Sequence, residues 1–417
     1  MNDIISILRS SYLGKLVDEE FLSDLKSLLE NKIVAAYVMK PAIVPSEESV
    51  PNTEIKCLPL PNEILVKIFG YLDIQDISRC AQVSCQFNKI SKDSSLWRSW
   101  GKVHIESMKV PTEFLAFIIQ RGITELSLFQ CEILPPRVKW RQPLNLKTLN
   151  LDETCGDKTL VNELLVSHPM EKVRFKDSKS LCGCVFDISQ FNKCLPKIGS
   201  HLKCLNFENG GLGKYGDLGN VALIVNTCLD LEELNISCNS LSEEAGAYLC
   251  ENLTANILKL DIEIGEEEPT EKGLNDNNIR ALVNRCPKLK VLDIRTNEKV
   301  TYQGVVAIIE RLHFIEYLGL PDSIGDELGL PDNIDLSKMR MLKSMKKLKE
   351  LLLGNEGDEY HSIFKREIPH LRKHEGPNFF EVALSSLSVS ITKDFRFVDF
   401  FPHCHKYDKS TYTDPNV

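Results

Sequence analysis

The sequence has no long apolar run and no surplus of positive charge. Hydrophobic residues make up 43% of its 417 residues, yet no stretch approaches the roughly 18 consecutive apolar residues of a membrane-spanning helix. The net charge is −9, whereas a general nucleic-acid-binding protein usually carries a basic face. These two absences exclude a membrane-spanning protein and argue against a nucleic-acid-binding one.

A secretory signal is also missing from the first residues. Asp3, Arg9 and Lys15 interrupt the apolar residues there, and no small-residue cleavage site follows. The 14 cysteines are therefore expected in a reducing compartment, where they act as free, small apolar side chains. We expect an intracellular protein of the cytoplasm, the nucleus or both.

Catalytic and metal-binding motifs are lacking as well. Neither G-x-S-x-G nor H-E-x-x-H occurs, and the glycine-rich stretch 209–220 lacks the phosphate-loop frame. Cys182 and Cys184 have no second ligand pair at zinc-site distance, and His403, Cys404 and His405 stand in a tail without a recognisable element. We therefore expect no enzyme, no cofactor and no metal.

Residues 57–102 form a segment rich in helix-forming patterns. Pro61 is suited to open a helix at its first turn, and a third short helix is expected over residues 85–91. The first helix has one apolar face, made of Ile64, Leu65, Ile68, Phe69 and Leu72. Residues 1–56 precede it, with an amphipathic helix from Asp18 onward and a linker at 41–56 that contains three prolines.

From residue 103 the sequence repeats itself. The pattern L-x-x-L-x-L, with other apolar residues sometimes replacing leucine, recurs nine times, at 123–128, 146–151, 170–175, 202–207, 231–236, 257–262, 289–294, 315–320 and 348–353. The steps between them are 23, 24, 32, 29, 26, 32, 26 and 33 residues, several of them at or beyond the upper end of leucine-rich repeats. Amphipathic helices such as those after residues 242 and 275 lie between them.

This alternation predicts an α/β fold: a leucine-rich-repeat solenoid that follows a short all-α segment. Each strand–helix unit has two apolar faces and buries them only by stacking on its neighbours, which gives a curved parallel sheet inside and helices outside. The repeats are expected over 103–355. Residues 356–417 form an irregular, phenylalanine-rich tail that could cap the open end.

Strand periodicity also predicts a binding surface. The side chains between the leucines should point to the concave face. Its third strand is basic, and the fourth to seventh strands are mostly acidic, so we expect a charge-segregated groove that holds an acidic or phosphorylated element at one place and a basic one at another. The residues are Lys172, Arg174, Lys176, Glu208, Glu233, Asp261, Glu263, Asp293 and Arg295. A solvated face without a dedicated ligand is the alternative.

Two patterns together carry a family resemblance. LPNEIL, IFGYL, VSCQFNKIS and SSLW, in that order from Leu60, resemble an F-box, and the repeats after it resemble those of F-box/leucine-rich-repeat proteins. The layout is similar to that of the S-phase-kinase-associated F-box receptor. Two positions depart from many F-boxes: Ser84 replaces a cysteine and Phe87 a tryptophan.

The resemblance implies a function. An F-box binds a small Skp-family adaptor, which joins it to a cullin and a RING subunit, while the repeats hold a protein substrate for ubiquitination. By the same resemblance, the residues that face the adaptor or pack and join the helices of the F-box are Leu60, Pro61, Ile64, Leu65, Ile68, Phe69, Leu72, Val83, Phe87, Leu96 and Trp97. The alternative is that they form only the core of a small helical domain.

A rival function stays open. A leucine-rich-repeat protein can block a partner by binding it, as the ribonuclease inhibitors do, without any ubiquitination. Binding of a Skp-family adaptor distinguishes the two, because only the first function requires it.

Overall fold

The structure is a computed structural model that describes residues 61–70, 72, 77, 80–81, 83–134, 145–156, 158–176, 188–212, 217–239, 241–263, 273–330, 333–354, 360–372 and 388–391. The chain divides into two compact units, residues 1–73 and 74–417, and each is considered by itself. The predicted N-terminal helix, the linker and the phenylalanines of the tail lie outside the described residues. Within the described residues, every helix is too short or too polar to span a bilayer.

The first unit contains helix α3, which spans Asn62–Phe69. Pro61 precedes it with a φ of −56°, which confirms the predicted opening of this helix, since proline's fixed φ suits a helix start. Leu65 and Phe69 are buried on one side of α3, whereas Ile64 is 39% exposed. The sequence also predicts a second helix, DIQDISRCAQV, with Asp73 at its start, and most of it lies outside the described residues.

The second unit begins with two short helices, α5 (Cys85–Ser91) and α6 (Ser94–Trp100). The bounds of α5 are those predicted for the third helix. The Ser84 hydroxyl accepts a hydrogen bond from the Phe87 N–H, and the Asp93 carboxylate accepts one from the Ser95 N–H. These side chains satisfy N–H groups that a helix start leaves free.

A parallel sheet of eleven strands follows, and all nine predicted strand segments belong to it. Ten of the strands lie side by side in chain order: β1, β3, β5 and then β7 to β13. Their central leucines or valines are register partners. The predicted segments correspond to β3 (Glu125–Phe129), β5 (Thr148–Asn150), β7 (Lys172–Arg174), β8 (Cys204–Asn206), β9 (Glu233–Asn235), β10 (Lys259–Asp261), β11 (Val291–Asp293), β12 (Tyr317–Leu320) and β13 (Glu350–Leu353).

Two strands of this sheet were not predicted by the repeat pattern. Strand β1 (Lys102–Glu106) precedes the first recurrence, and β14 (Ser388–Ile391) comes from the tail. The two strands pair in parallel, with Lys102 opposite Ser388 and Ile105 opposite Ile391. Part of the tail therefore covers the edge of the sheet at β1, where the backbone of an edge strand would otherwise be open to pairing.

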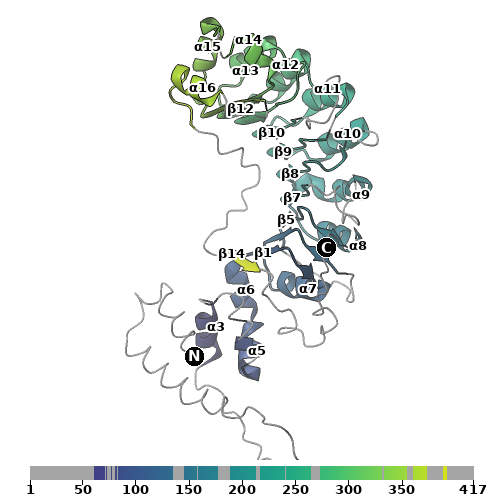
Figure 1. The fold of residues 1–417 in the computed structure, drawn as a ribbon. Coiled ribbons are helices and arrows are strands. Elements are labelled where there is room, and N and C mark those ends of the chain that lie inside the picture. Colours follow the sequence, from purple (N-terminus) through teal and green to yellow (C-terminus); the bar gives the residue numbers. More distant parts are fainter. Residues whose placement is uncertain are drawn as a thin grey trace, which may run out of the picture. The chain divides into compact units, whose positions relative to one another are not determined.

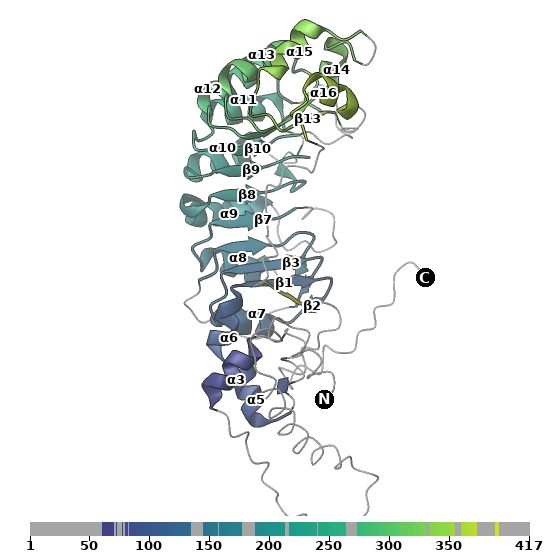
Figure 2. The ribbon, with the colours of Figure 1, turned by 90° about the vertical axis from the view of Figure 1, so that its left-hand side faces the viewer.

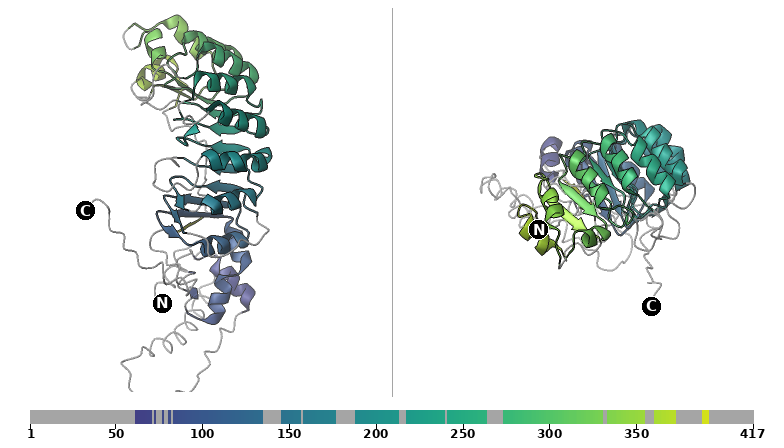
Figure 3. Two further views of the ribbon diagram at one scale, coloured as in Figure 1. Left: turned by 90° about the vertical axis from the view of Figure 1, so that its right-hand side faces the viewer. Right: turned by 90° about the horizontal axis from the view of Figure 1, so that it is seen from above.

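In the second unit, helices cover one face of the eleven-stranded sheet, as Figure 1 shows. Figures 2 and 3 show the same two layers from other directions. The inward leucines of the strands, such as Leu149, Leu234 and Leu292, have no exposed surface, so the core lies between the layers. The helices are α7 (Thr112–Gln120), α8 (Lys158–Val166), α9 (Ile188–Ile198), α10 (Asp217–Thr227), α11 (Glu243–Asn252), α12 (Asp276–Arg285) and α13 (Tyr302–Arg311).

Six strands of the large sheet end in the same kind of turn. A non-glycine residue with positive φ stands four positions after the central inward residue, in six repeats: Ser107, Gln130, Glu153, Asn209, Cys238 and Thr296. In four of these turns the side chain of the next residue, Cys131, Thr154, Asn239 or Asn297, donates to backbone carbonyl groups. The Asn239 amide, for example, donates to the carbonyl groups of Phe207, Ile236 and Ser237 at 2.7–3.0 Å. The Asn297 amide makes the corresponding hydrogen bonds in the turn after β11, to the carbonyl groups of Ile262, Ile294 and Arg295.

Beside these turns, three two-residue strands form a second small sheet in the order β2–β4–β6. They are β2 (Lys109–Val110), β4 (Glu132–Ile133) and β6 (Cys155–Gly156). A 3₁₀ turn, η2 (Gly199–His201), links α9 to β8.

The repeats extend past the predicted limit at residue 355. Helices α14 (Ser323–Glu327) and α15 (Leu336–Lys343) precede β13, and α16 (His361–Glu367) follows it. The Arg372 N–H then donates to the Lys349 carbonyl, as the Lys349 N–H does to the Glu316 carbonyl. The ladder of backbone bonds therefore continues for one more step than the leucine pattern indicates.

Candidate functional site

The predicted adaptor-facing residues fall into two groups. Ile64 and Val83 are exposed, at 39% and 56%, and Pro61 is exposed too. Ile68 and Phe87 are half-buried. These five residues have apolar surface that another protein could cover.

The other group is buried within the chain itself. Trp97 and Leu96 have 0% and 1% exposed surface, and the remaining members, Leu65, Phe69 and Leu72, are also buried. Sequence reasoning could not separate the groups, because a residue that packs a helix and one that meets a partner share the same apolar face. For the buried group the core alternative fits, and Leu60 lies outside the described residues.

Trp97 holds the short helices to the first helix of the repeats. Its indole N–H donates to the Ser91 carbonyl at 2.8 Å. Its ring meets the edge-to-face rings of Phe117 and Phe114, with centroids 5.1 and 6.5 Å away. The Arg121 guanidinium lies 3.4 Å from the centre of the Phe117 ring and donates to the Lys92 carbonyl at 2.9 Å. Burial lowers the pKa of Arg121 to about 10.

The predicted concave surface has a lane of asparagine and aspartate at the centre of its strands. Five of these side chains accept a hydrogen bond from the backbone N–H two residues ahead: Asn150, Asn206, Asn235, Asp261 and Asp293. All five are buried. Their first role is thus to fix the turn after each strand, which corrects the expectation that Asp261 and Asp293 are open to a substrate.

Charges on this face are interleaved rather than segregated. Arg174 lies 2.5 Å from Asp152 of the preceding strand segment, and Lys176 lies 2.8 Å from Glu208 of the next. Lys259 and Glu233 pair at 3.1 Å. Within the described residues, Lys172 is the predicted cation that stays exposed. Most of the expected charge therefore already has a counter-charge inside the chain, and substrate binding by these residues stays a prediction.

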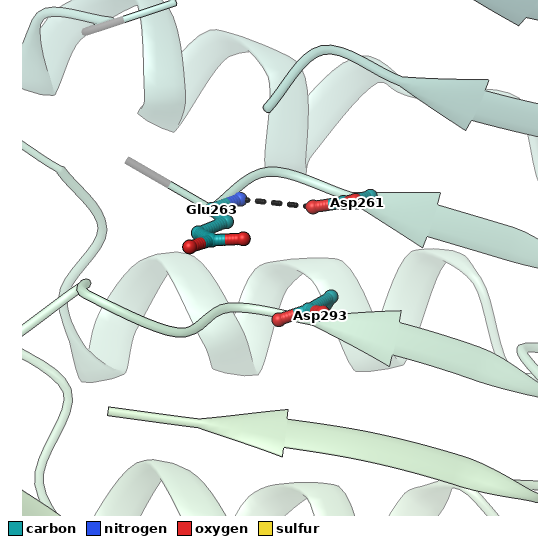
Figure 4. Close-up of side chains that lie close together, drawn as sticks. All are labelled: Asp261, Glu263 and Asp293. Atoms are coloured by element: carbon teal, nitrogen blue, oxygen red, sulfur yellow. Dashed lines mark hydrogen bonds between the residues drawn. The ribbon is translucent and has the colours of Figure 1, made fainter. Parts of the chain in front are cut away.

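Asp261, Glu263 and Asp293 form the densest acidic group on the face (Figure 4). One carboxylate oxygen of each lies within 4.8 Å of the others. Arg295 provides the cation here, because its guanidinium reaches Asp293 at 3.0 Å and Glu263 at 3.0 Å. Burial lowers the pKa of Arg295, but the charge and hydrogen bond of Asp293, with the charges of Tyr317 and Glu263, together hold it above its usual value.

Burial raises the pKa of Asp261 well above its ordinary value, and the neighbouring charge of Asp293 raises it further. The carboxyl of Asp261 therefore keeps its proton under conditions in which an exposed aspartate has lost it. In this state it resembles the asparagines of the same lane on β5, β8 and β9.

The turn-forming role of the lane was missed from the sequence, although a signal was there. Five segments read leucine, then asparagine or aspartate, then leucine, isoleucine or phenylalanine: LNL, LNF, LNI, LDI and LDI. An outward position on a strand that binds a varied partner need not keep one side-chain shape. A repeated asparagine or aspartate there instead indicates a local bond to the backbone.

Comparison with known proteins places the first segment. Residues 58–100 match the family model described as F-box-like. The chain is also 44% identical over 45 residues to F-box/LRR-repeat protein 5 of Bos taurus, 42% over 45 residues to that of Mus musculus, and 46% over 39 residues to that of Xenopus laevis. These stretches cover 9–11% of this chain and 6% of each relative. The likeness to the S-phase-kinase-associated receptor stays a prediction.

Two solved structures are similar at low identity. The Rad7 and Elc1 complex of yeast matches with a TM-score of 0.39 and 13% identity, over 64% of this chain and 61% of that chain. The leucine-rich-repeat protein LegL7 of Legionella pneumophila matches with a TM-score of 0.38 and 12% identity, over 69% and 90%.

Proposed function

This chain joins an F-box-like domain to a leucine-rich-repeat solenoid, and we propose that it is a substrate-recognition subunit of a cullin–RING ubiquitin ligase of the SCF type. The match of residues 58–100 to the F-box-like model is the observation that carries this proposal. In it, a Skp-family adaptor binds the F-box, and cullin and RING subunits join through the adaptor. The ligase would act in the cytoplasm, the nucleus or both.

The chain itself contributes position rather than bond-making chemistry in this proposal. A substrate held on the repeats stays close to the ubiquitin-charged enzyme, which raises the effective concentration of its lysines. Such a role needs a firm connection between the F-box and the repeats. Within the second unit, the buried contacts of Trp97 with Phe114 and Phe117 join α6 to α7, the first helix of the repeats.

Exposed apolar side chains of the F-box-like segment are the groups we expect the adaptor to cover. Ile64 and Val83 are large apolar residues with substantial exposed surface. Burying one such side chain stabilises a complex by about 1.5–3 kcal/mol. Replacing either by aspartate should therefore weaken adaptor binding without disturbing the core.

The experiment is co-purification of the full chain with a Skp-family adaptor. We expect Ile64→Asp and Val83→Asp to lose adaptor, while Val166→Asp and Leu229→Asp retain it. The controls are matched, because Val166 and Leu229 are exposed apolar residues of the repeats, at 39% and 61%.

If the unchanged chain does not retain the adaptor, the proposal is wrong. Binding or inhibition of a partner protein by the repeats, without ubiquitination, would then be the better-supported function. Recovery of the same protein partners by the intact chain and by one that lacks residues 57–100 would support that alternative further.

A further inference from the structure

The last repeats carry a row of charged residues at the edge where their strands begin. The Glu316 N–H donates to the Lys290 carbonyl at 2.7 Å, and the Lys349 N–H donates to the Glu316 carbonyl at 2.7 Å. The Arg372 N–H in turn donates to the Lys349 carbonyl at 2.6 Å. Lys290, Glu316, Lys349 and Arg372 therefore follow one another in line, about one strand spacing of 4.8 Å apart.

A second row stands two residues earlier in each of these repeats. It consists of Lys288, Phe314, Lys347 and His370, all of them exposed. Phe314 is 47% exposed, a large value for an aromatic ring. The Lys347 ammonium lies 4.2 Å from the centre of the Phe314 ring. An open aromatic ring thus stands among cations.

Positive charge exceeds negative charge in the two rows. Their acidic member is Glu316, which forms an ion pair with Lys349. The hydrogen bond from Lys349 holds the pKa of the Glu316 carboxyl below its usual value, burial opposes this, and the charges of Lys349, Lys290 and Lys347 add to the lowering. Three lysines therefore act on one carboxylate.

The two repeats directly before them differ at the same positions, whereas Lys147 and Lys203 place single lysines in the first row of two earlier repeats. Glu232 and Asp230 occupy the two rows before β9, and Leu258 and Asn256 occupy them before β10. The chain as a whole carries a net charge of −9. Cations are therefore concentrated at the end of the repeats that contains β12, α13, α15 and α16 (Figure 1), against the overall charge.

We propose that this surface, the basic strip, binds an extended acidic protein segment that also carries one large apolar side chain. The basic strip consists of Lys288, Lys290, Lys346, Lys347, Lys349 and Arg372. The acidic side chains of the segment would lie along the two rows, and its apolar side chain would cover Phe314. This site is separate from the concave face and does not depend on adaptor binding.

An acidic polypeptide fits this surface better than a nucleic acid. Single-stranded nucleic acids stack successive bases on several aromatic side chains, whereas these rows hold one phenyl ring, that of Phe314, and one imidazole, that of His370. A long polyanion would also meet the net negative charge of the rest of the chain. A short acidic segment needs only the strip itself, because an apolar or aromatic residue can form the centre of an interface while charged residues form its solvent-accessible rim.

The test is fluorescence anisotropy with the full chain and a labelled peptide of about twelve residues, rich in glutamate with one central phenylalanine. Replacing Lys346, Lys347 and Lys349 together by glutamate should weaken binding about tenfold or more. Replacing Lys193, Lys197 and Lys203 together by glutamate should change it less than about twofold. All six lysines are exposed and the change in net charge is the same.

Further arms test the chemistry of the segment. Phe314→Ala should weaken binding of the peptide that contains phenylalanine. It should leave binding of a peptide with serine in place of that phenylalanine unchanged. Replacing the three lysines by glutamine, with thermal unfolding unchanged, separates lost binding from lost folding. The proposal is overturned if the two triple variants lose affinity equally, if no binding is seen up to about 1 mM, or if a single-stranded oligonucleotide binds the strip more tightly than the peptide.

Discussion

Asp261 and Asp293 are register partners on neighbouring strands, and Arg295 binds Asp293 through its Nε at 3.0 and 3.1 Å. The Tyr317 hydroxyl also donates to Asp293 at 2.9 Å. Asp261 accepts from the Glu263 N–H at 3.2 Å and keeps its proton because it is buried beside Asp293. Two aspartates in one lane of the sheet therefore have different surroundings: Asp293 contacts a cation and a hydroxyl donor, whereas burial and the charge of Asp293 raise the pKa of Asp261.

Asparagine substitution should distinguish the two aspartates. Asp261→Asn preserves the shape and the acceptor of the turn while removing a group that resists ionisation, so we expect it to raise the free energy of unfolding by about 1 kcal/mol at pH 7. Asp293→Asn removes the fully buried one of the two carboxylates that pair with Arg295, leaving Glu263, and should lower it by about 3 kcal/mol. Urea denaturation followed by circular dichroism measures both. Equal effects of the two substitutions would contradict this assignment.

The Asp261 effect should also depend on pH. Its pKa in the folded chain is raised, whereas in the unfolded chain it is about 4. Above pH 4 the unfolded chain releases a proton that the folded chain retains, so this residue lowers stability as pH rises. The advantage of Asp261→Asn should therefore be small near pH 4 and grow towards pH 7. A stability difference that is constant between pH 4 and 7 would show that Asp261 is ionised in the fold.

The stability of the fold should depend strongly on Asn239, the buried asparagine at the turn after β9. The Asn239 side-chain amide donates to three carbonyl groups, and an aspartate of the same shape offers no donor. We expect Asn239→Asp to lower the free energy of unfolding by about 2–3 kcal/mol, since buried carbonyls lose their partner. Asn252→Asp is the control, because the Asn252 amide donates to one exposed carbonyl, that of Tyr248. Similar losses for both would refute the turn role.

How much of this could be predicted follows from what each pattern reports. The spacing of leucines such as Leu149, Leu234 and Leu292 predicted where the strands lie, because each stacked repeat needs an inward apolar residue at the same position. Strand β14 was missed, since Ser388–Ile391 pairs with β1 through backbone groups that leave no mark in the side-chain pattern.

The candidate site was predicted less completely. Alternation correctly placed Asp261 and Arg174 between inward residues. It could not show that Asp261 bonds to its own turn or that Arg174 meets Asp152, because the partners come from other positions and from other repeats. The cations before β11 and β13 were overlooked for the same reason: Lys288 and Lys347 flank the row position of Phe314 only when the repeats stack.

The contact of Trp97 with the first repeat helix gives the last prediction. Trp97 has no exposed surface, and it combines an indole hydrogen bond to the Ser91 carbonyl with two aromatic contacts. Trp97→Phe keeps part of the packing and loses the hydrogen bond, so it should cost about 1–2 kcal/mol. Trp97→Ala should cost about 3–5 kcal/mol. Hydrogen exchange of residues 85–120 locates the loss.

If the junction is firm, exchange in α5, α6 and α7 should speed up together in Trp97→Ala, while exchange in β9 to β12 stays unchanged. Acceleration confined to α6 would mean that this helix does not transmit packing to the repeats. The F-box-like segment would then be a tethered module, and a substrate on the repeats would have no defined position relative to the adaptor. Joint acceleration therefore supports positioning by a rigid connection, which is the physical basis of the proposed receptor role.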